Sequence, residues 1–531
     1  MRKIILITVF LFLIVIVVTG LYFSRIKLSR QNITNVISQI PQDAALVFEF
    51  KNDSEFYELF KENNLLTSFI GQKKAEELKY LHDNLLKNNI LNTALLNQSI
   101  YISLHSETNS GNIEMLLTTS SDGITDSQKT LETIIEKTNG AFEVEKIGSK
   151  TIQKATFPAL KEVFYITNNA HVLAGSFSKA LLLNFLDERV ENKVSNFTQI
   201  SDQRNKNSLA NLYVNYTQFP VLFKQLFRYQ NDDFFRLINN FQATAALSLN
   251  FKSDALLFNG YTKTDTTAVT YLNIFIRQKP VTNTIKAVYP INTASAVSFA
   301  YGNTTDYLAA LYKWQIKLHH NLKANTLYNQ IKKETGITIQ TAFNKQLGNE
   351  FSLLTTAENE KLAIIKVKNG SELEPYLRNL SVDANSMHMR LKYENLPFYL
   401  LGEPFLHFKQ PYFVLIDNYL VLSNSENGIE HYLNNYQHQH FLNEDGQYYN
   451  FDALLAEQSN VSFFIHLPNS FHSLKKQLQP KFAQLFDQKN SSWKNYYAAA
   501  LQFTASESSF YTNFYLQNRQ DTVKRNSSIS N

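Results

Sequence analysis

Apolar and polar residues alternate with a period of two in several short stretches, which is typical of half-buried strands. Residues 99–104 form one such stretch, in which every second residue from Ile100 onward is apolar, and the short run at residues 351–354 is also typical of a strand. Residues 75–86 and 127–137 instead carry apolar residues near the spacing of a helix. Strands that cluster around short polar turns favour an antiparallel α+β sheet with helices on one face over a doubly wound parallel fold.

The longest apolar run covers residues 4–23, twenty residues without a charge. At ~1.5 Å per residue, a helix of this length spans the ~30 Å hydrocarbon core of a bilayer. The alternative is a cleaved signal peptide, whose apolar region is usually about 7–15 residues long and ends in a small-residue cleavage site. This run is longer, and residues 20–25 offer no such site. We therefore expect an uncleaved transmembrane anchor, with its amino end inside and the bulk of the chain exported.

Similar sequence patterns recur in the two halves of the chain at a spacing of roughly 250 residues. A proline-containing turn that leads into a strand occurs at residues 40–50 and again at 289–299. Residues 212–215 and 463–466 correspond in the same way, so that Asn215 aligns with His466. Because several such pairs recur in the same order, we expect an internal duplication.

The expected fold class is therefore α+β, with an N-terminal transmembrane helix followed by two repeated, mainly antiparallel sheet-plus-helix halves. The expected segments are an anchor with its flanks at 1–30, a first repeat at 31–264, a connector at 265–287, a second repeat at 288–517 and a polar tail at 518–531.

Composition and charge exclude several classes of protein. The chain has 531 residues and no cysteine, so disulfides, thiolate metal sites and cysteine nucleophiles are excluded. It has only 15 glycines and neither of the glycine-rich motifs that hold phosphates. The net charge is +5, and the first 30 residues, with five basic and no acidic side chains, account for all of it. The remainder therefore carries no basic excess of the kind that nucleic-acid binding requires, and we expect no nucleic-acid partner.

One short motif carries a family resemblance. A single N-terminal span, the sequence Pro41-Gln42-Asp43-Ala44 at the opening of a strand and a long α+β region follow one another. This layout resembles an uncharacterised bacterial family of single-pass, membrane-anchored domains of unknown function, and the residue usage is similar to that of members from the Bacteroidota. The resemblance implies a location in the bacterial cell envelope. It implies no catalytic residue.

The most concentrated group of metal-ligand residues contains His438, His440 and Glu444. On an extended strand, His438 and His440 would point to the same side and could bind a metal together with the nearby carboxylate. The alternative is a solvated loop that follows a helix. Asp43 lies in the turn motif, but Asn292 takes its place in the second half. Because an amide cannot act as a general acid or base, we interpret both as turn residues.

A run of phenylalanines, Phe219, Phe223 and Phe227, is spaced to share one face of a helix. Core packing explains this spacing, and a groove for an apolar ligand is the alternative.

These observations predict a non-enzymatic binding or scaffold module that is anchored in the bacterial inner membrane through residues 4–23, with most of the chain in the periplasm. We expect no catalytic residues and no cofactor. The expected partners are the lipid bilayer and either another envelope protein or an apolar ligand. One alternative is a carrier or sensor of lipids or other apolar ligands. Another is a metal-dependent hydrolase that uses the histidines of the second half.

Overall fold

The computed structural model describes residues 36–519, apart from 53–71, 97, 107–111, 125, 170, 188–196, 202, 206–207, 229–232, 253, 385–387 and 488–491. The chain divides into two compact units, and the boundary between their described residues lies between Ser201 and Gln203. The predicted anchor at residues 4–23 lies outside the described residues. Among the helices that the structure does describe, none is long and apolar enough to cross a membrane.

The first unit contains an antiparallel sheet with the strand order β1-β2-β3-β7-β6-β5-β4. Its described strands are β1 Ala44–Lys51, β2 Ser99–Ser106, β3 Ile113–Ser120, β4 Ala141–Ile147, β5 Lys150–Thr156, β6 Phe164–Asn169 and β7 Val172–Ser176. Its described helices are α4 Gln72–Leu81, the π-helical turn η1 His82–Leu86, α5 Asn89–Ala94, α6 Ser127–Lys137, α7 Lys179–Phe185 and α8 Thr198–Ser201.

The core of the first unit forms where α4, η1, α5 and α6 pack against the sheet. Helix α6 begins after Asp126, whose side chain accepts a hydrogen bond from the backbone N–H of Lys129 and so caps the helix. Its buried residues Leu131, Ile134 and Ile135 recur at helical spacing and contact the apolar side chains of β5 and β6. The helix predicted at residues 127–137 is therefore stabilised both by its cap and by the burial of its apolar face.

The second unit contains a larger antiparallel sheet. Its described strands are β8 Ala210–Asn215, β9 Ala243–Lys252, β10 Ala255–Thr264, β12 Thr293–Ala300, β13 Leu347–Thr356, β14 Lys361–Val367, β15 Ser381–Ala384, β16 Met389–Leu391, β17 Tyr412–Ile416, β18 Tyr419–Ser423, β20 Val461–His466, β21 Tyr496–Ser506 and β22 Ser509–Asn518. A separate two-stranded ladder joins β11 Val281–Thr282 to β19 Gln458–Ser459.

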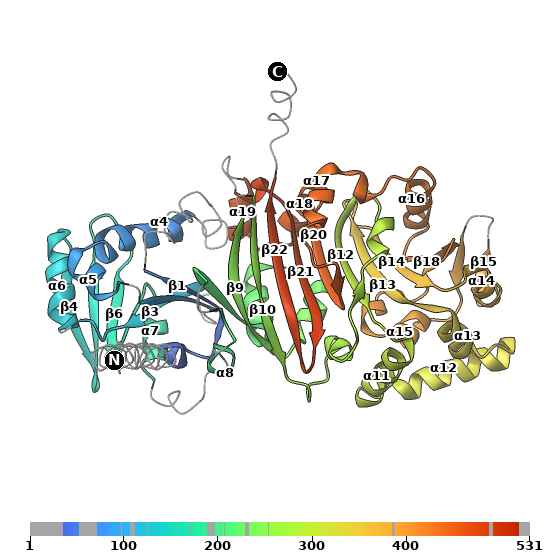
Figure 1. The fold of residues 1–531 in the computed structure, drawn as a ribbon, viewed down its shortest axis with the longest axis horizontal. Coiled ribbons are helices and arrows are strands. Elements are labelled where there is room, and N and C mark those ends of the chain that lie inside the picture. Colours follow the sequence, from blue (N-terminus) through green and yellow to red (C-terminus); the bar gives the residue numbers. More distant parts are fainter. Residues whose placement is uncertain are drawn as a thin grey trace, which may run out of the picture. The chain divides into compact units, whose positions relative to one another are not determined.

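Hydrogen bonding connects the larger sheet in the order β8-β9-β10-β22-β21-β20-β12-β13-β14-β18-β17-β16-β15. The green strands β9 and β10 therefore lie beside the red strands β22 and β21 (Figure 1). From β12 to β18, the order is β12-β13-β14-β18-β17-β16-β15, which is the order that β1 to β7 have in the first unit.

Helices cover both faces of the second sheet. Its described helices are α9 Phe219–Leu226, α10 Asp233–Asn239, α11 Thr304–Lys317, α12 His320–Thr335, α13 Ile339–Gln346, α14 Gly370–Asn379, α15 Leu396–Leu401, α16 Glu426–Gln437, α17 Gly446–Asp452, α18 Leu467–Gln477 and α19 Pro480–Asp487. On one face, α16 and α17 bury Ile429 and Phe451 against Ala296 of β12 and its neighbours. On the other face, Tyr307 of α11 packs against Phe351 of β13. The prediction from the sequence that helices cover only one face of the sheet was therefore wrong for the second unit.

The fold class predicted from the sequence was wrong. It separated two repeated halves, whereas β8, β9 and β10 of the expected first half belong to the large antiparallel sheet of the second unit. The physical reason is that β10 has an edge whose backbone groups need partners. Strand β22 supplies them, in an unbroken register from the Ala255–Gln517 pair to the Lys263–Ser509 pair. One sheet therefore contains strands from both sides of the connector expected at residues 265–287.

Candidate functional site

Helix α16 presents two carboxylates on one face. Its N-cap is Ser425, whose hydroxyl accepts a hydrogen bond from the backbone N–H of Gly428 at 3.0 Å. Glu426 follows in the first turn, where the helix dipole favours a negative charge. Glu430 lies four residues later and therefore on the same face. Two like charges at this spacing destabilise a helix by about 0.2–0.5 kcal/mol, a cost that a bound cation would remove.

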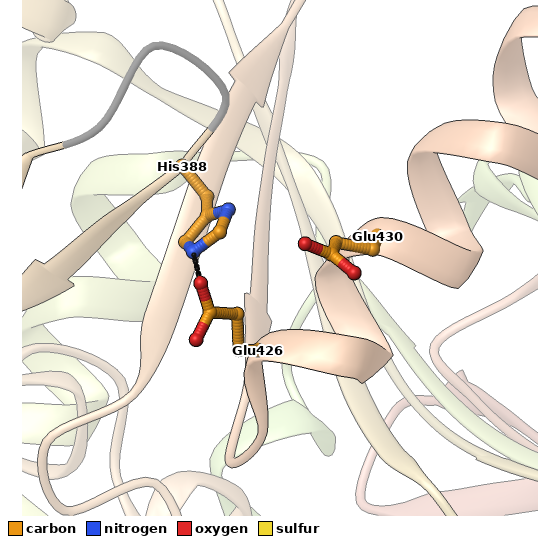
Figure 2. Close-up of side chains that lie close together, drawn as sticks. All are labelled: His388, Glu426 and Glu430. Atoms are coloured by element: carbon orange, nitrogen blue, oxygen red, sulfur yellow. Dashed lines mark ion pairs between the residues drawn. The ribbon is translucent and has the colours of Figure 1, made fainter.

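The sheet brings His388 to these carboxylates. His388 immediately precedes β16, which pairs with β17, and β17 pairs with β18 just before α16 begins. Its side chain is 3% exposed, and its ring lies 5.7 Å from the ring of Tyr412, at an interplanar angle of 70°. The Nε2 atom lies 2.7 Å from Oε1 of Glu426, whose side chain is 50% exposed. Figure 2 shows this ring nitrogen pointing at the Glu426 carboxylate. A buried imidazole therefore faces a carboxylate that solvent can reach.

The three residues together form a candidate metal centre. One ligand atom from each of His388, Glu426 and Glu430 lies within 4.8 Å of the others (Figure 2). An imidazole nitrogen with two carboxylate oxygens suits Zn²⁺, Mn²⁺ or Fe²⁺. Four-coordinate Zn²⁺ with bonds of about 2.0–2.2 Å holds its ligand atoms about 3.4 Å apart. Because Oε1 of Glu426 lies only 2.7 Å from Nε2 of His388, this carboxylate would have to move outward when the metal binds between them. Without a metal, a protonated His388 would form a simple ion pair with Glu426.

The residues predicted from the sequence lie at the other end of α16. His438 is the C-cap of this helix, and its Nδ1 lies 2.8 Å from the carbonyl oxygen of Asn434. Gln439 has a φ of 56°, so the chain turns here instead of extending as the hypothesis of a strand required. The rings of His438 and His440 nevertheless stack, with centroids 5.7 Å apart. In the described part of the chain, Glu444 does not join them in a three-residue ligand group.

Only part of the His388 group could have been found from the sequence. The spacing of Glu426 and Glu430 is visible in a stretch that reads as helical. Nothing local connects them to His388, because the contact depends on the pairing of β16, β17 and β18.

A second polar group lies in the first unit, where sequence analysis assigned only a turn. His105 of β2 has its Nδ1 2.9 Å from Oδ1 of Asp43 and its Nε2 2.8 Å from Oγ of Ser103. Burial raises the pKa of the Asp43 carboxyl, but the hydrogen bond and the charge of His105 outweigh it and leave this pKa below its ordinary value. Ser103 and His105 alternate on one strand, so both lie on the same face of the sheet.

The histidine contacts a serine through one ring nitrogen and an aspartate through the other, as in a hydrolase triad, but Ser103 is inaccessible. Its relative exposure is 0%, and its hydroxyl also donates a hydrogen bond to the carbonyl oxygen of Leu116 at 3.3 Å. The backbone of Ser103 lies between Val47 of β1 and Leu116 of β3, in the interior of the sheet. A substrate carbonyl cannot approach the hydroxyl there. The group is therefore a buried polar network that joins the turn at Asp43 to β2.

Two further features bear on ligand binding. A recess in the second unit has a volume of ≈ 10 Å³, about enough for one water molecule. It is lined by Pro290, Asn292, Thr356, Glu360, Leu362, Gly428, His431, Tyr432 and Asn435. The phenylalanines of α9 pack on one another, with ring centroids 5.1 Å apart for Phe219 and Phe223 and 5.9 Å for Phe223 and Phe227. Phe223 and Phe227 also contact Phe235 of α10, so these side chains contribute to a core.

Comparison with known proteins adds little to this description. No family model matches the chain, and no curated protein matches it. A solved structure described as crystal form III of TP0453 aligns with 47% of this chain and 89% of its own, at 12% identity and a TM-score of 0.23. A likeness at that TM-score carries no argument about fold or function.

Proposed function

We propose that the protein is a non-enzymatic binding module and that it binds a divalent cation through His388, Glu426 and Glu430. The observation that carries this proposal is the convergence of three ligand atoms within 4.8 Å. His388 is held by the sheet and by Tyr412, which fixes one ligand before the metal arrives. The two exposed carboxylates give the metal access from solvent. Three protein ligands leave at least one coordination position open for a group of the binding partner.

Titration of the full chain with Zn²⁺ and Mn²⁺ after treatment with a chelator tests the proposal. The variants Glu430→Gln and Glu426→Gln remove one charge each and retain the shape of the side chain. We expect each to weaken binding at least about tenfold, the effect of losing about 1.4 kcal/mol of binding free energy. The matched control is the double variant His438→Ala, His440→Ala, which should bind as the wild type does. If the control loses the metal and the glutamine variants retain it, the centre lies at the sequence-predicted histidines instead.

The same geometry favours a second candidate function. A catalytic zinc site commonly has three protein ligands and a water molecule that the metal activates. The Zn²⁺-loaded chain would then hydrolyse simple activated esters or phosphoesters, and Glu430→Gln would abolish this activity. Absence of turnover by a chain that has bound zinc would leave the binding function as the conclusion.

We place this binding in the bacterial cell envelope, with residues 4–23 as the inner-membrane anchor. The support is the length and composition of this run in the sequence. Deletion of residues 2–23 should release the chain from the membrane fraction in alkaline carbonate. Retention of the deleted chain in that fraction would contradict the assigned anchor without affecting the metal centre.

A further inference from the structure

Helices α11 and α12 form a hairpin on one face of the second unit. Toward the sheet, α11 buries Tyr307, Leu311 and Trp314, which recur at helical spacing. Trp314 packs edge-on against Tyr271, with ring centroids 5.5 Å apart. Helix α12 buries Ala324 and Ile331 in the same way. The inner face of the hairpin is therefore buried against the rest of the second unit.

The outer side of the same hairpin is also apolar. Around the turn between the helices, the side chains of Tyr312, Ile316, Leu318 and Leu322 are 46%, 43%, 38% and 65% exposed. At 100° per residue, Ile316 points almost directly away from the buried face of α11. A soluble surface helix ordinarily carries polar residues there. Four large apolar side chains gathered at one turn indicate a surface that is covered when the protein functions.

The charge of this hairpin indicates what covers it. The two helices contain five lysines, at positions 313, 317, 323, 332 and 333, and two acidic residues, Asp306 and Glu334, which lie at the helix ends remote from the turn. Lys313, Lys317 and Lys323 are exposed and alternate with the exposed apolar side chains. Apolar side chains among lysines are the pattern of helices that lie in the interface of an anionic membrane. A second copy of the chain does not fit as well, because a two-fold contact would bring lysines against lysines.

We propose that the turn of the α11–α12 hairpin binds to the surface of a bilayer that contains anionic lipids. Ile316, Leu318 and Leu322 enter the boundary between headgroups and acyl chains. The lysines keep their ammonium groups at the level of the lipid phosphates, with their apolar stems along the membrane surface. This contact is separate from the predicted anchor at residues 4–23 and does not depend on the metal centre.

The absence of cysteine from the natural chain allows a direct test. The variant Leu322→Cys gives the full chain a single thiol, which can carry a dye whose emission shifts to shorter wavelength in an apolar environment. On addition of vesicles that contain phosphatidylglycerol, we expect this shift, and we expect none with pure phosphatidylcholine. The matched control is Tyr449→Cys, at an apolar side chain of α17 that is 72% exposed but lies outside the hairpin. Its dye should not respond.

The contribution of charge is measured in the same assay. Each of the substitutions Lys313→Gln, Lys317→Gln and Lys323→Gln should raise the lipid concentration at half-maximal shift by about fivefold. An equal shift in neutral vesicles, or an equal response at position 449, would overturn the proposal. A shift that appears with protein concentration in the absence of lipid would also overturn it and would assign the surface to a second copy of the chain. Binding of an acidic polypeptide but not of vesicles would assign it to a protein partner.

Discussion

The Nδ1 atom of His105 lies 2.9 Å from Oδ1 of Asp43, so the turn before β1 is tied to the interior of β2. Because the other ring nitrogen faces the buried hydroxyl of Ser103, we predict that Ser103 stabilises the fold and performs no catalysis. A serine-reactive fluorophosphonate should leave Ser103 unlabelled. The variant Ser103→Ala should lower the free energy of unfolding by about 1–3 kcal/mol, since it leaves a buried ring nitrogen without its partner. Ser127→Ala, at an exposed hydrogen bond, is the control and should cost less. Labelling of Ser103 in the folded chain would contradict this assignment.

A second prediction concerns acid stability and His466 at the start of α18. Burial lowers the pKa of this imidazole to about 4, against the opposing effects of Asp445 and Asn469. Between pH ~6.5 and about 4, the unfolded chain binds a proton that the folded chain does not. Stability is therefore lost as the pH falls through this window, by about 3 kcal/mol in all, and His466 has no such effect above it.

The variant His466→Asn tests this contribution, because His466 is the N-cap of α18 and asparagine is a favoured N-cap residue, as Asn215 is before the 3-10 helix Tyr216–Gln218. Its free energy of unfolding should exceed that of the wild type at pH 5 by more than it does at pH 7.5. Urea titrations at the two pH values measure the difference. Parallel pH dependence in the two proteins would show that another group is responsible.

Asn460 should be among the most sensitive positions of the second unit. Its side-chain amide is fully buried and donates hydrogen bonds to the carbonyl oxygens of Gln278, Lys279 and Ala300, at 3.3, 3.2 and 3.1 Å. Its Oδ1 accepts from the backbone N–H of Ala505 at 2.8 Å. Replacement by alanine leaves buried backbone groups without partners, and we expect a loss of about 2–4 kcal/mol in urea denaturation. A change below about 0.5 kcal/mol would mean that these groups find other partners.

Gly260 of β10 should tolerate no side chain. A Cβ atom at this position would overlap the carbonyl oxygen of Ala246 in β9. Because that oxygen belongs to the paired backbone, Gly260→Val should destabilise the second unit by about 1–3 kcal/mol. The control is Gly446→Ala at the start of α17, where a Cβ atom meets nothing within 4 Å. We expect this control to be neutral or to stabilise by about 0.4–1 kcal/mol. Thermal unfolding of both variants gives the comparison.

The local elements of this fold are largely visible in the sequence. The helix expected at residues 127–137 is present with these bounds as α6, since its cap and its apolar spacing are both local signals. The strand expected at 99–104 is present as β2. However, Tyr101 was not expected on the buried face of that strand and has no exposed surface, because both faces are covered. Alternation cannot show what will pack on the second face of a strand.

Contacts between residues far apart in the chain could not be predicted from the sequence in the same way. The pairing of β10 with β22 depends on backbone groups, which every sequence supplies equally. The meeting of His388 with Glu426 depends in turn on two strand pairings, of β16 with β17 and of β17 with β18. The hypothesis of a metal site at His438 and His440 required both residues to lie on one extended strand. Gln439 instead has a left-handed backbone conformation at the end of α16, so no such strand forms there.

The β10–β22 pairing also has a consequence for how the chain folds. Thr262 and Thr512 meet across these strands although they are 250 residues apart. Contacts at such separations slow folding, because the entropy of loop closure is lost before the contact is gained. During synthesis, β10 emerges long before β22, and the backbone N–H and C=O groups along that edge of β10 stay unpaired for that interval. The protein should therefore be a slow folder whose nascent chains depend on chaperones, and truncations that remove β22 should aggregate.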